Sequence, residues 1–352
     1  MPNKNKNMTA DKVLVGIVGY KSEDHIFACI ESVLAQTYKN IEIIYYDNYG
    51  LDNALDIVQT NFPQVKCVKS DSNLGYGKAH NWIINNYEFG FYMPLNPDLI
   101  LSEDFISNCY GEIQGDPTIG AINGILYHLK DGKKTSVVYS CGHIMQRDRR
   151  IDNLHYGIDV SGKDITSRFV FGPNGACPLL KKEMIRDVEV NKSFFDPAFF
   201  MYGDDFDIGW RMSKAGWKTL FSPHCKAWHI IGGSEPFKNR KIRVDYIANR
   251  LILILKNERF FLFLRDLPLI LIIELFFLLV LSLKRPAFII DYISGIKKFL
   301  FHIPYAIRLR KQIRTRTSLR DEINFYEKNY LSRFVTLVQR QIIKGRNLSH
   351  VK

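Results

Sequence analysis

Blocks of hydrophobic and polar residues alternate along the first 235 residues, as is typical of strands separated by helices. The short apolar runs predict strands at 13–19, 41–46, 65–69 and 89–95. The mixed stretches between them predict helices at about 23–36, 53–61 and 77–86. Such a series predicts an α/β fold, with a parallel sheet and right-handed crossovers. Beyond residue 98 the pattern loosens, with further strands expected at 135–139 and within 170–180.

Acidic residues follow two of these strands. Asp47 ends the second, and Asn96-Pro-Asp98 ends the fourth. A third acidic segment contains Asp204, Asp205 and Asp207, and His229 follows the end of that segment, Arg211, by eighteen residues. Ligands of open α/β sheets bind beyond the carboxyl ends of the strands, so these groups are expected to converge on one cleft. Each also has a structural interpretation, because Asn-Pro-Asp favours turns and acids favour the first turn of a helix.

Composition limits the class of protein. A hydrophobic fraction of 46% excludes wholesale disorder. The six cysteines stand singly, without a Cys-x-x-Cys pair, which argues against a zinc ribbon or a disulfide framework and favours a reducing cytosol. Residues 1–12 are polar, and we expect a disordered tail without a secretory signal.

Positive charge is concentrated in the C-terminal third. Residues 238–352 contain 24 Lys and Arg against 8 Asp and Glu, whereas the whole chain has a net charge of +12. Residues 238–352 are therefore predicted to form a basic, apolar, helical extension that associates with a membrane, following a catalytic domain at 13–237. Nothing in the tail resembles an RNA-binding module, so we expect no nucleic-acid partner.

The segment 267–283 is apolar on every helical face but contains Glu274. Its 17 residues are at the lower limit for crossing a bilayer, and a buried charge there costs a few kcal/mol. Lys and Arg flank both ends, and such flanks prefer the cytoplasmic side. We favour a re-entrant or in-plane element at the inner leaflet over a true span, a buried helix or an oligomer contact. The basic run 308–320 would then lie on anionic headgroups.

An ordered set of motifs over 13–234 resembles the family 2 glycosyltransferases, specifically their bacterial rhamnosyltransferase-like branch. The set comprises Val15-Gly-Ile-Val-Gly-Tyr20, Asp47-Asn48 with Asp52, Asn73 to Asn81, Asn96-Pro-Asp98, Gly172 to Ala176, Phe200 to Asp207 and His229. The resemblance implies a GT-A fold, a Rossmann-like sheet that binds a nucleotide-sugar. It also implies a nucleoside-diphosphate sugar donor, a divalent cation and inversion at the anomeric carbon.

The resemblance assigns roles to individual residues. Asp98 and His229 would bind Mn²⁺ or Mg²⁺, whose charge offsets that of the departing diphosphate. Asp205 would be the general base that removes the acceptor proton. The donor nucleotide would contact Tyr20, Asp47, Gly75 and Asn96, and acceptor binding or support would come from Asp204, Gly175, Ala176 and Arg211. An acid at Asp47 that pairs with a ring N–H suggests uridine or thymidine.

The expected protein is an inverting, metal-dependent transferase at the cytoplasmic face of the inner membrane, peripheral or monotopic, with an oligomer possible through the C-terminal region. The leading donor is dTDP-L-rhamnose, and a UDP-sugar (hexose, N-acetylhexosamine or galactofuranose) is the alternative. A membrane-tethered domain implies, by analogy, an undecaprenyl-diphosphate-linked glycan acceptor of O-antigen or capsule synthesis. A sugar nucleotidyltransferase would need a Gly- and Arg-containing loop after the first strand, which 19–24 does not supply. A catalytically silent membrane adaptor is the remaining hypothesis.

Overall fold

The computed structural model describes residues 11–200, 202–230 and 239–327. In these residues one sheet has the strand order β10-β12-β6-β11-β4-β1-β2-β3, with β5 on β12 and β7 on β6. Its strands are β1 (Val13–Gly19), β2 (Ile41–Asp47), β3 (Lys66–Lys69), β4 (Phe91–Leu95), β5 (Leu99–Leu101), β6 (Ile119–Lys130), β7 (Lys133–Ser140), β10 (Arg168–Val170), β11 (Leu179–Lys181) and β12 (Lys218–Ile230). A separate pair is formed by β8 (His143–Met145) and β9 (Ile151–Asn153).

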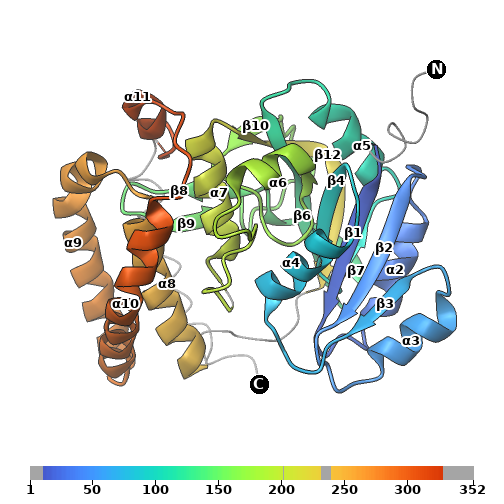
Figure 1. The fold of residues 1–352 in the computed structure, drawn as a ribbon, viewed down its shortest axis with the longest axis horizontal. Helices are drawn as coiled ribbons and strands as arrows, with labels where there is room; N and C mark the ends of the chain where they lie inside the picture. Colours follow the sequence, from blue (N-terminus) through green and yellow to red (C-terminus); the bar gives the residue numbers. More distant parts are fainter. Residues whose placement is uncertain (1–10, 201, 231–238, 328–352) are drawn as a thin grey trace.

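Helices cover both faces of this sheet (Figure 1). They are α2 (Ile26–Leu34), α3 (Ala54–Asn61), α4 (Tyr76–Asn86), α5 (Phe105–Ile113), α6 (Lys182–Val188) and α7 (Asp204–Ala215). Strand β1 shows why. Val13, Val15 and Ile17 pack with α2, α3 and α5, whereas Leu14 packs with α4, α6 and α7. Because successive side chains of a strand point to opposite faces, a central strand that is apolar throughout requires a helical layer on each side.

The predicted βαβ series is confirmed through β4, where β1 pairs in parallel with β2 and β4. The sheet is not parallel throughout, however. Strand β11 runs antiparallel to both β4 and β6, and the two longest strands, β6 and β12, were not predicted. The predicted strand within 170–180 is present only as β10 and β11 at its ends. The residues between them form a loop, because Pro173 lacks a backbone donor and glycines flank it.

Helix α7 lies directly against this loop. A Cβ atom on Gly172 would come within 2.7 Å of the Cα of Gly209, and one on Gly209 within 2.9 Å of the Cα of Gly172. Any larger residue at either position would push the acidic start of α7 away from the sheet.

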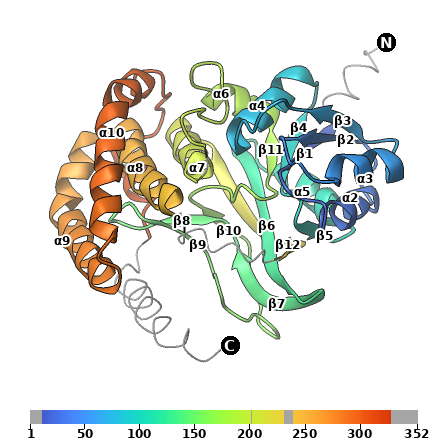
Figure 2. The same cartoon turned by 90° about the horizontal axis from the view of Figure 1, so that it is seen from below.

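The C-terminal helices α8 (Arg240–Asn257), α9 (Phe260–Lys284) and α10 (Phe288–Arg310) lie side by side at the end of the molecule opposite α3, and α11 (Leu319–Ile323) follows (Figures 1 and 2). They are anchored to the α/β part of the chain by buried charges. The Nζ atom of Lys256 lies 2.6 Å from Asp196 and 2.8 Å from Asp207. Asp196 also accepts a hydrogen bond from Tyr305 of α10 at 2.5 Å. The C-terminal helices therefore pack against the part of the chain that precedes the predicted boundary at 237/238. Residues 231–238 lie outside the described part.

Helix α9 differs from the expected all-round apolar helix. The carboxylate of Glu274 faces the catalytic domain, 2.5 Å from Arg250 and 3.2 Å from Arg150. The opposite face is apolar and exposed, and includes Ile272, Leu275 and Leu279. The predicted cost of an unpaired charge in hydrocarbon does not apply, because Glu274 is paired with Arg150 and Arg250 and accepts a hydrogen bond from Tyr292. Within the described ranges, α9 is the one helix long and apolar enough to cross a bilayer, judged by length and composition alone.

Two predictions about basic and terminal segments need correction. Arg314 and Arg316 of the run 308–320 pair with Asp187 of α6, Arg316 at 2.6 Å, so part of that run faces the catalytic domain rather than headgroups. In the predicted tail, residues 1–10 lie outside the described part, but Lys12 forms an ion pair with Glu42 at 2.7 Å and so is ordered against the sheet.

Candidate active site

The first half of the site is the turn between β4 and β5. Strand β5 pairs with β12 so that Leu99 lies opposite His229, and the Ile230 N–H donates to the Asp98 carbonyl at 2.9 Å. This register brings His229 Nε2 to 3.5 Å from Asp98 Oδ1. The imidazole stacks on the ring of Tyr139, with centroids 4.5 Å apart and planes 3° from parallel. Two residues 131 positions apart in sequence are thus held together, as predicted.

Asp98 and His229 fit a divalent cation. Asp98 Oδ1 and His229 Nδ1 are buried, and neither has a hydrogen-bond partner in the described part of the chain. Buried polar atoms of this kind require a partner, and a carboxylate with an imidazole suits Mn²⁺. No cluster of three or more His, Cys, Asp or Glu side chains is found in the described ranges. Two protein ligands are nevertheless sufficient where substrate phosphates complete the coordination.

The second half of the site is the first turn of α7. The Asp205 carboxylate accepts a hydrogen bond from the Phe206 N–H at 2.9 Å and lies 2.8 Å from Nε2 of His143. His143 is buried, and its ring packs edge-on against Phe206 with centroids 4.7 Å apart. Each carboxylate oxygen has two lone pairs, so Asp205 can still accept a proton from a hydroxyl group. His143 was not predicted, because it lies in a three-residue strand without a recognisable pattern.

Asp204 differs from its neighbour in burial. It is 6% exposed, and a Cβ on Gly77 of α4 would lie 4.0 Å from its Oδ2. Burial, and secondarily the adjacent charge of Asp205, raise the pKa of Asp204 to about 7. The side chain of Asp204 is therefore buried beneath the site. The side chain of Asp205 is 21% exposed and can be reached by a substrate.

Tyr139 connects the two halves electrostatically. Burial raises its pKa to about 12, and the charges of both Asp98 and Asp205 add to the effect. The phenol of Tyr139 therefore responds to the carboxylates of both halves of the site.

The loop before β11 joins the halves through its backbone. The Asn96 N–H donates to the Ala176 carbonyl at 2.9 Å, and a Cβ on Gly175 would lie 3.6 Å from Asp205 Oδ2. Asn96, Gly175 and Ala176 therefore lie between the two halves of the site.

The predicted donor residues occupy the edge formed by β1 and β2. Asp47 Oδ1 accepts a hydrogen bond from the Gly50 N–H at 2.9 Å, and Tyr20 is half exposed at the end of β1. Gly75 has a φ of 78°, which favours glycine, but a Cβ there would meet Phe200 at 2.9 Å. The group that lies close to Gly75 is thus Phe200 of the same chain, whereas the donor nucleotide was predicted to contact this glycine.

Arg211 lies outside the cleft. It is buried, 2.7 Å from Asp207, and also donates to the backbone carbonyl of Phe194 at 2.5 Å. Burial would raise the pKa of Asp207, but Arg211 and Lys256 outweigh that effect and hold it below its ordinary value. Arg211 cannot contact an acceptor from this position, and it supports α7 through the core.

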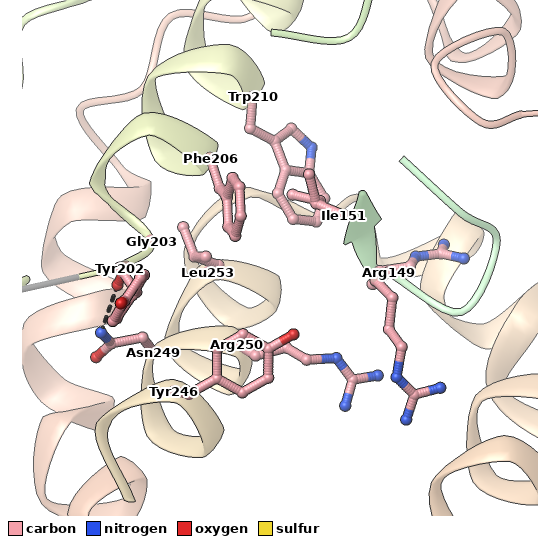
Figure 3. A pocket seen from close by; sticks show the side chains of 11 residues that line it. Arg149, Ile151, Tyr202, Gly203, Phe206, Trp210, Tyr246, Asn249, Arg250 and Leu253 are labelled. Atoms are coloured by element: carbon pink, nitrogen blue, oxygen red, sulfur yellow. Dashed lines mark hydrogen bonds between the residues drawn. The ribbon is translucent and has the colours of Figure 1, made fainter. Parts of the chain in front are cut away.

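A narrow cavity adjoins the first turn of α7, the acid turn that carries Asp204 and Asp205 (Figure 3). Tyr202, Gly203 and Phe206 line one side of it, and Tyr246 and Arg250 of α8 line the other.

Residues 14–172 match the family model described as Glycosyl transferase family 2. This part of the chain is therefore similar to family 2 glycosyltransferases. It is 24% identical over 243 residues to N-acetylglucosaminyl-diphospho-decaprenol L-rhamnosyltransferase of Mycobacterium tuberculosis (strain ATCC 25618 / H37Rv), covering 62% of this chain and 76% of that one. It is 27% identical over 168 residues to chondroitin synthase of Escherichia coli, covering 42% of this chain but only 24% of that one.

The transferase domain also resembles a solved structure. The crystal structure of GalNAc-T7 with UDP, GalNAc and Mn²⁺ superposes with a TM-score of 0.54 at 16% sequence identity, covering 69% of this chain and 47% of that one. This similarity shows that the fold is of the GT-A type, as predicted.

Proposed function

We propose that this protein transfers a sugar, with inversion, from a nucleoside-diphosphate donor to a hydroxyl group of a lipid-linked glycan. The observation that carries the proposal is that the Asp98–His229 pair and Asp205 are connected through the loop before β11, where the Asn96 N–H donates to the Ala176 carbonyl and Gly175 lies against Asp205. This arrangement supports a leaving-group site at Asp98 and His229 and a base at Asp205. Inversion requires both, because the hydroxyl group attacks opposite the bond that breaks.

On the donor side, Asp98 and His229 would hold a divalent cation, which when bound neutralises charge that develops on the diphosphate. Asp47, at the end of β2, would accept the ring N–H of uracil or thymine. Tyr20 and the Asn96 turn complete the donor half.

On the acceptor side, Asp205 takes the proton of the attacking hydroxyl group as that oxygen bonds to the anomeric carbon. We assign His143 as a positioning residue. Its hydrogen bond holds one carboxylate oxygen of Asp205 and leaves lone pairs of the other for the substrate. Its burial restricts the rotamers of both side chains.

L-Rhamnose from a dTDP donor is the sugar we favour, and a relative that is an L-rhamnosyltransferase supports this assignment. The lipid diphosphate in the name of that relative supports an acceptor of the same kind, for which we favour undecaprenyl diphosphate. The exposed apolar face of α9, together with the pairing of Glu274 with Arg250 of α8, supports an in-plane position at the cytoplasmic membrane face.

The first test is calorimetric titration of the full chain with UDP, dTDP, GDP and CDP, each with Mn²⁺ and with EDTA. We expect dTDP or UDP to bind only with the cation. If UDP alone binds, the donor is a UDP-sugar. If no nucleotide binds, the chain is a silent adaptor and the proposal fails.

The second test is Asp205→Asn. We expect transfer to be lost while cation-dependent nucleotide binding is retained, because Asn has a similar shape but is not a base. Asp56→Asn, which removes an exposed acid from α3, is the matched control and should retain transfer. Full activity of Asp205→Asn would remove Asp205 from its assigned role.

A further inference from the structure

A cavity of about 500 Å³ opens between β9, α8, α9 and α10. This volume is within the usual range for sites that bind small molecules. Its walls are mostly apolar and include Phe277, Leu278 and Leu281 of α9 and Phe288 of α10. We call this cavity the interhelical groove.

Cations are concentrated along the interhelical groove. Five lining side chains are basic (Arg150, Arg243, Arg250, Lys284 and Arg285) and two are acidic (Asp152 and Glu274). Arg150 and Arg250 share the single carboxylate of Glu274, and Asp148 and Asp291 pair with Arg150 and Arg243 from outside the lining. The buried Nε of Arg250 has no hydrogen-bond partner in the part of the chain that the structure describes. The groove therefore combines an apolar wall with an unused guanidinium donor.

One end of the interhelical groove approaches the catalytic base. Arg250 and Tyr246 line both the groove and the narrow cavity of Figure 3, whose other wall includes Tyr202 and Phe206. The narrow cavity, of about 20 Å³, lies beside the turn that carries Asp205, because Tyr202, Gly203 and Phe206 of that turn line it. A ligand in the groove would thus end at the Tyr246 and Arg250 side of this turn.

The other end of the interhelical groove approaches the exposed apolar surface. Lys284 and Arg285 line that end, and the adjacent Leu283 is 76% exposed. On α10, Ile289 next to the lining residue Phe288 is 48% exposed. An apolar chain leaving the groove here would continue along the surface that we place at the membrane.

We propose that the interhelical groove binds the isoprenoid diphosphate part of the acceptor. The isoprenoid chain lies against Phe277, Leu278 and Leu281, the diphosphate contacts the Arg250 end, and the attached sugar projects over Tyr202 toward Asp205. Charge complementarity and the continuity of groove, acid turn and apolar surface favour this occupant over a neutral lipid or a second copy of the chain. This assignment rests on the proposed transferase function, and it adds the place where the acceptor binds.

The test uses farnesyl diphosphate as the probe, titrated into the full chain in mild detergent. EDTA is present so that a divalent cation cannot hold the diphosphate of the probe at the donor site. Farnesol and inorganic diphosphate are the comparators. We expect farnesyl diphosphate to bind about tenfold or more tightly than either, because only it engages both the apolar wall and the cations. Equal binding of farnesol would show a general lipid groove and overturn the proposal, as would the absence of probe binding.

Variants locate the binding. Leu278→Trp and, separately, Leu281→Trp fill the groove and should each weaken farnesyl diphosphate binding about tenfold, a usual effect of overpacking a contact. Leu279→Trp, at a neighbouring position that is 60% exposed and outside the lining, is the matched control and should bind normally. Equal affinities in all three variants would place the probe elsewhere.

Nucleotide binding separates this inference from the function on which it rests. Each variant is also titrated with UDP and dTDP in the presence of Mn²⁺, which reports both folding and the donor site. If nucleotide binding is normal but the probe does not bind the wild-type chain, the groove assignment is wrong and the transferase function stands. If neither ligand binds the wild-type chain, the transferase function fails as well.

Discussion

Replacing Asp204 by Asn should make the protein's stability less sensitive to pH. Burial and the neighbouring Asp205 raise the pKa of Asp204 from 3.8 to about 7. Between these values the folded state binds more protons than the unfolded state, so stability falls as pH rises through this window. Above pH 7 the folded protein holds an unfavourable buried charge.

The size of the effect follows from the shift. Each pKa unit corresponds to 1.36 kcal/mol, so a shift of about three units destabilises the folded state by about 4 kcal/mol above pH 7. Near pH 4 the carboxyl is neutral in the folded state, and the penalty is nearly absent. Asn has nearly the volume of Asp and carries no charge. We therefore expect Asp204→Asn to be more stable than the wild type by up to about 4 kcal/mol at pH 8, with the difference shrinking toward pH 4.

Urea unfolding at intervals from pH 5 to 8.5 measures this difference directly. Asp56→Asn, which removes an exposed carboxylate from α3, is the control and should follow the wild type at every pH. A free-energy difference between Asp204→Asn and the wild type that stays constant from pH 5 to 8.5 would refute the assigned burial penalty. So would a variant that is less stable than the wild type at pH 8.

Three further outcomes are expected. Asp98→Ala should abolish the Mn²⁺-dependent part of UDP or dTDP binding in calorimetry, and binding that still responds to EDTA would remove Asp98 from the cation site. His143→Phe should lower kcat for transfer about tenfold or more while nucleotide binding stays unchanged. His143→Gln keeps a hydrogen-bond donor for Asp205 and should recover part of the loss. Equal kcat in both variants would make His143 purely structural. Gly209→Ala should destabilise the fold by about 1–3 kcal/mol, because the added Cβ meets the Cα of Gly172 at 2.9 Å. The control Gly111→Ala, in open space on α5, should not destabilise it. Equal shifts of the melting temperature in the two variants would contradict the close packing of α7.

Much of the site was predictable because its residues occupy local positions that sequence patterns mark. Asp47 and Asp98 follow apolar strands, and the carboxyl ends of parallel strands meet at one edge of a sheet. Asp205 lies in the acidic first turn of a helix. These features depend on neighbours along the chain, so the central strands and the acidic first turn of α7 were accessible before the structure. The GT-A type of fold was implied by the family resemblance.

Other features depend on residues that are distant in sequence. His143 lies 62 positions from Asp205, and only the packing of β8 against α7 brings them together. Arg211 matched a site motif, yet the carboxylate of Asp207 and the carbonyl of Phe194 hold it in the core. Strands β6 and β12 pair with each other along most of their length, a non-local contact that neither segment's pattern reveals.

The sequence by itself determined which segments are strands at the centre of the sheet, which carboxylates follow them and that α9 is strongly apolar. Local spacing and hydrophobicity contain that information. Only the tertiary structure decided which side chains face each other: Tyr139 with His229, His143 with Asp205, and Glu274 with Arg250. The physical reason is that a buried charge or ring needs a partner to be stable, and here a segment distant in sequence supplies it. Which segment that is depends on how the whole chain folds.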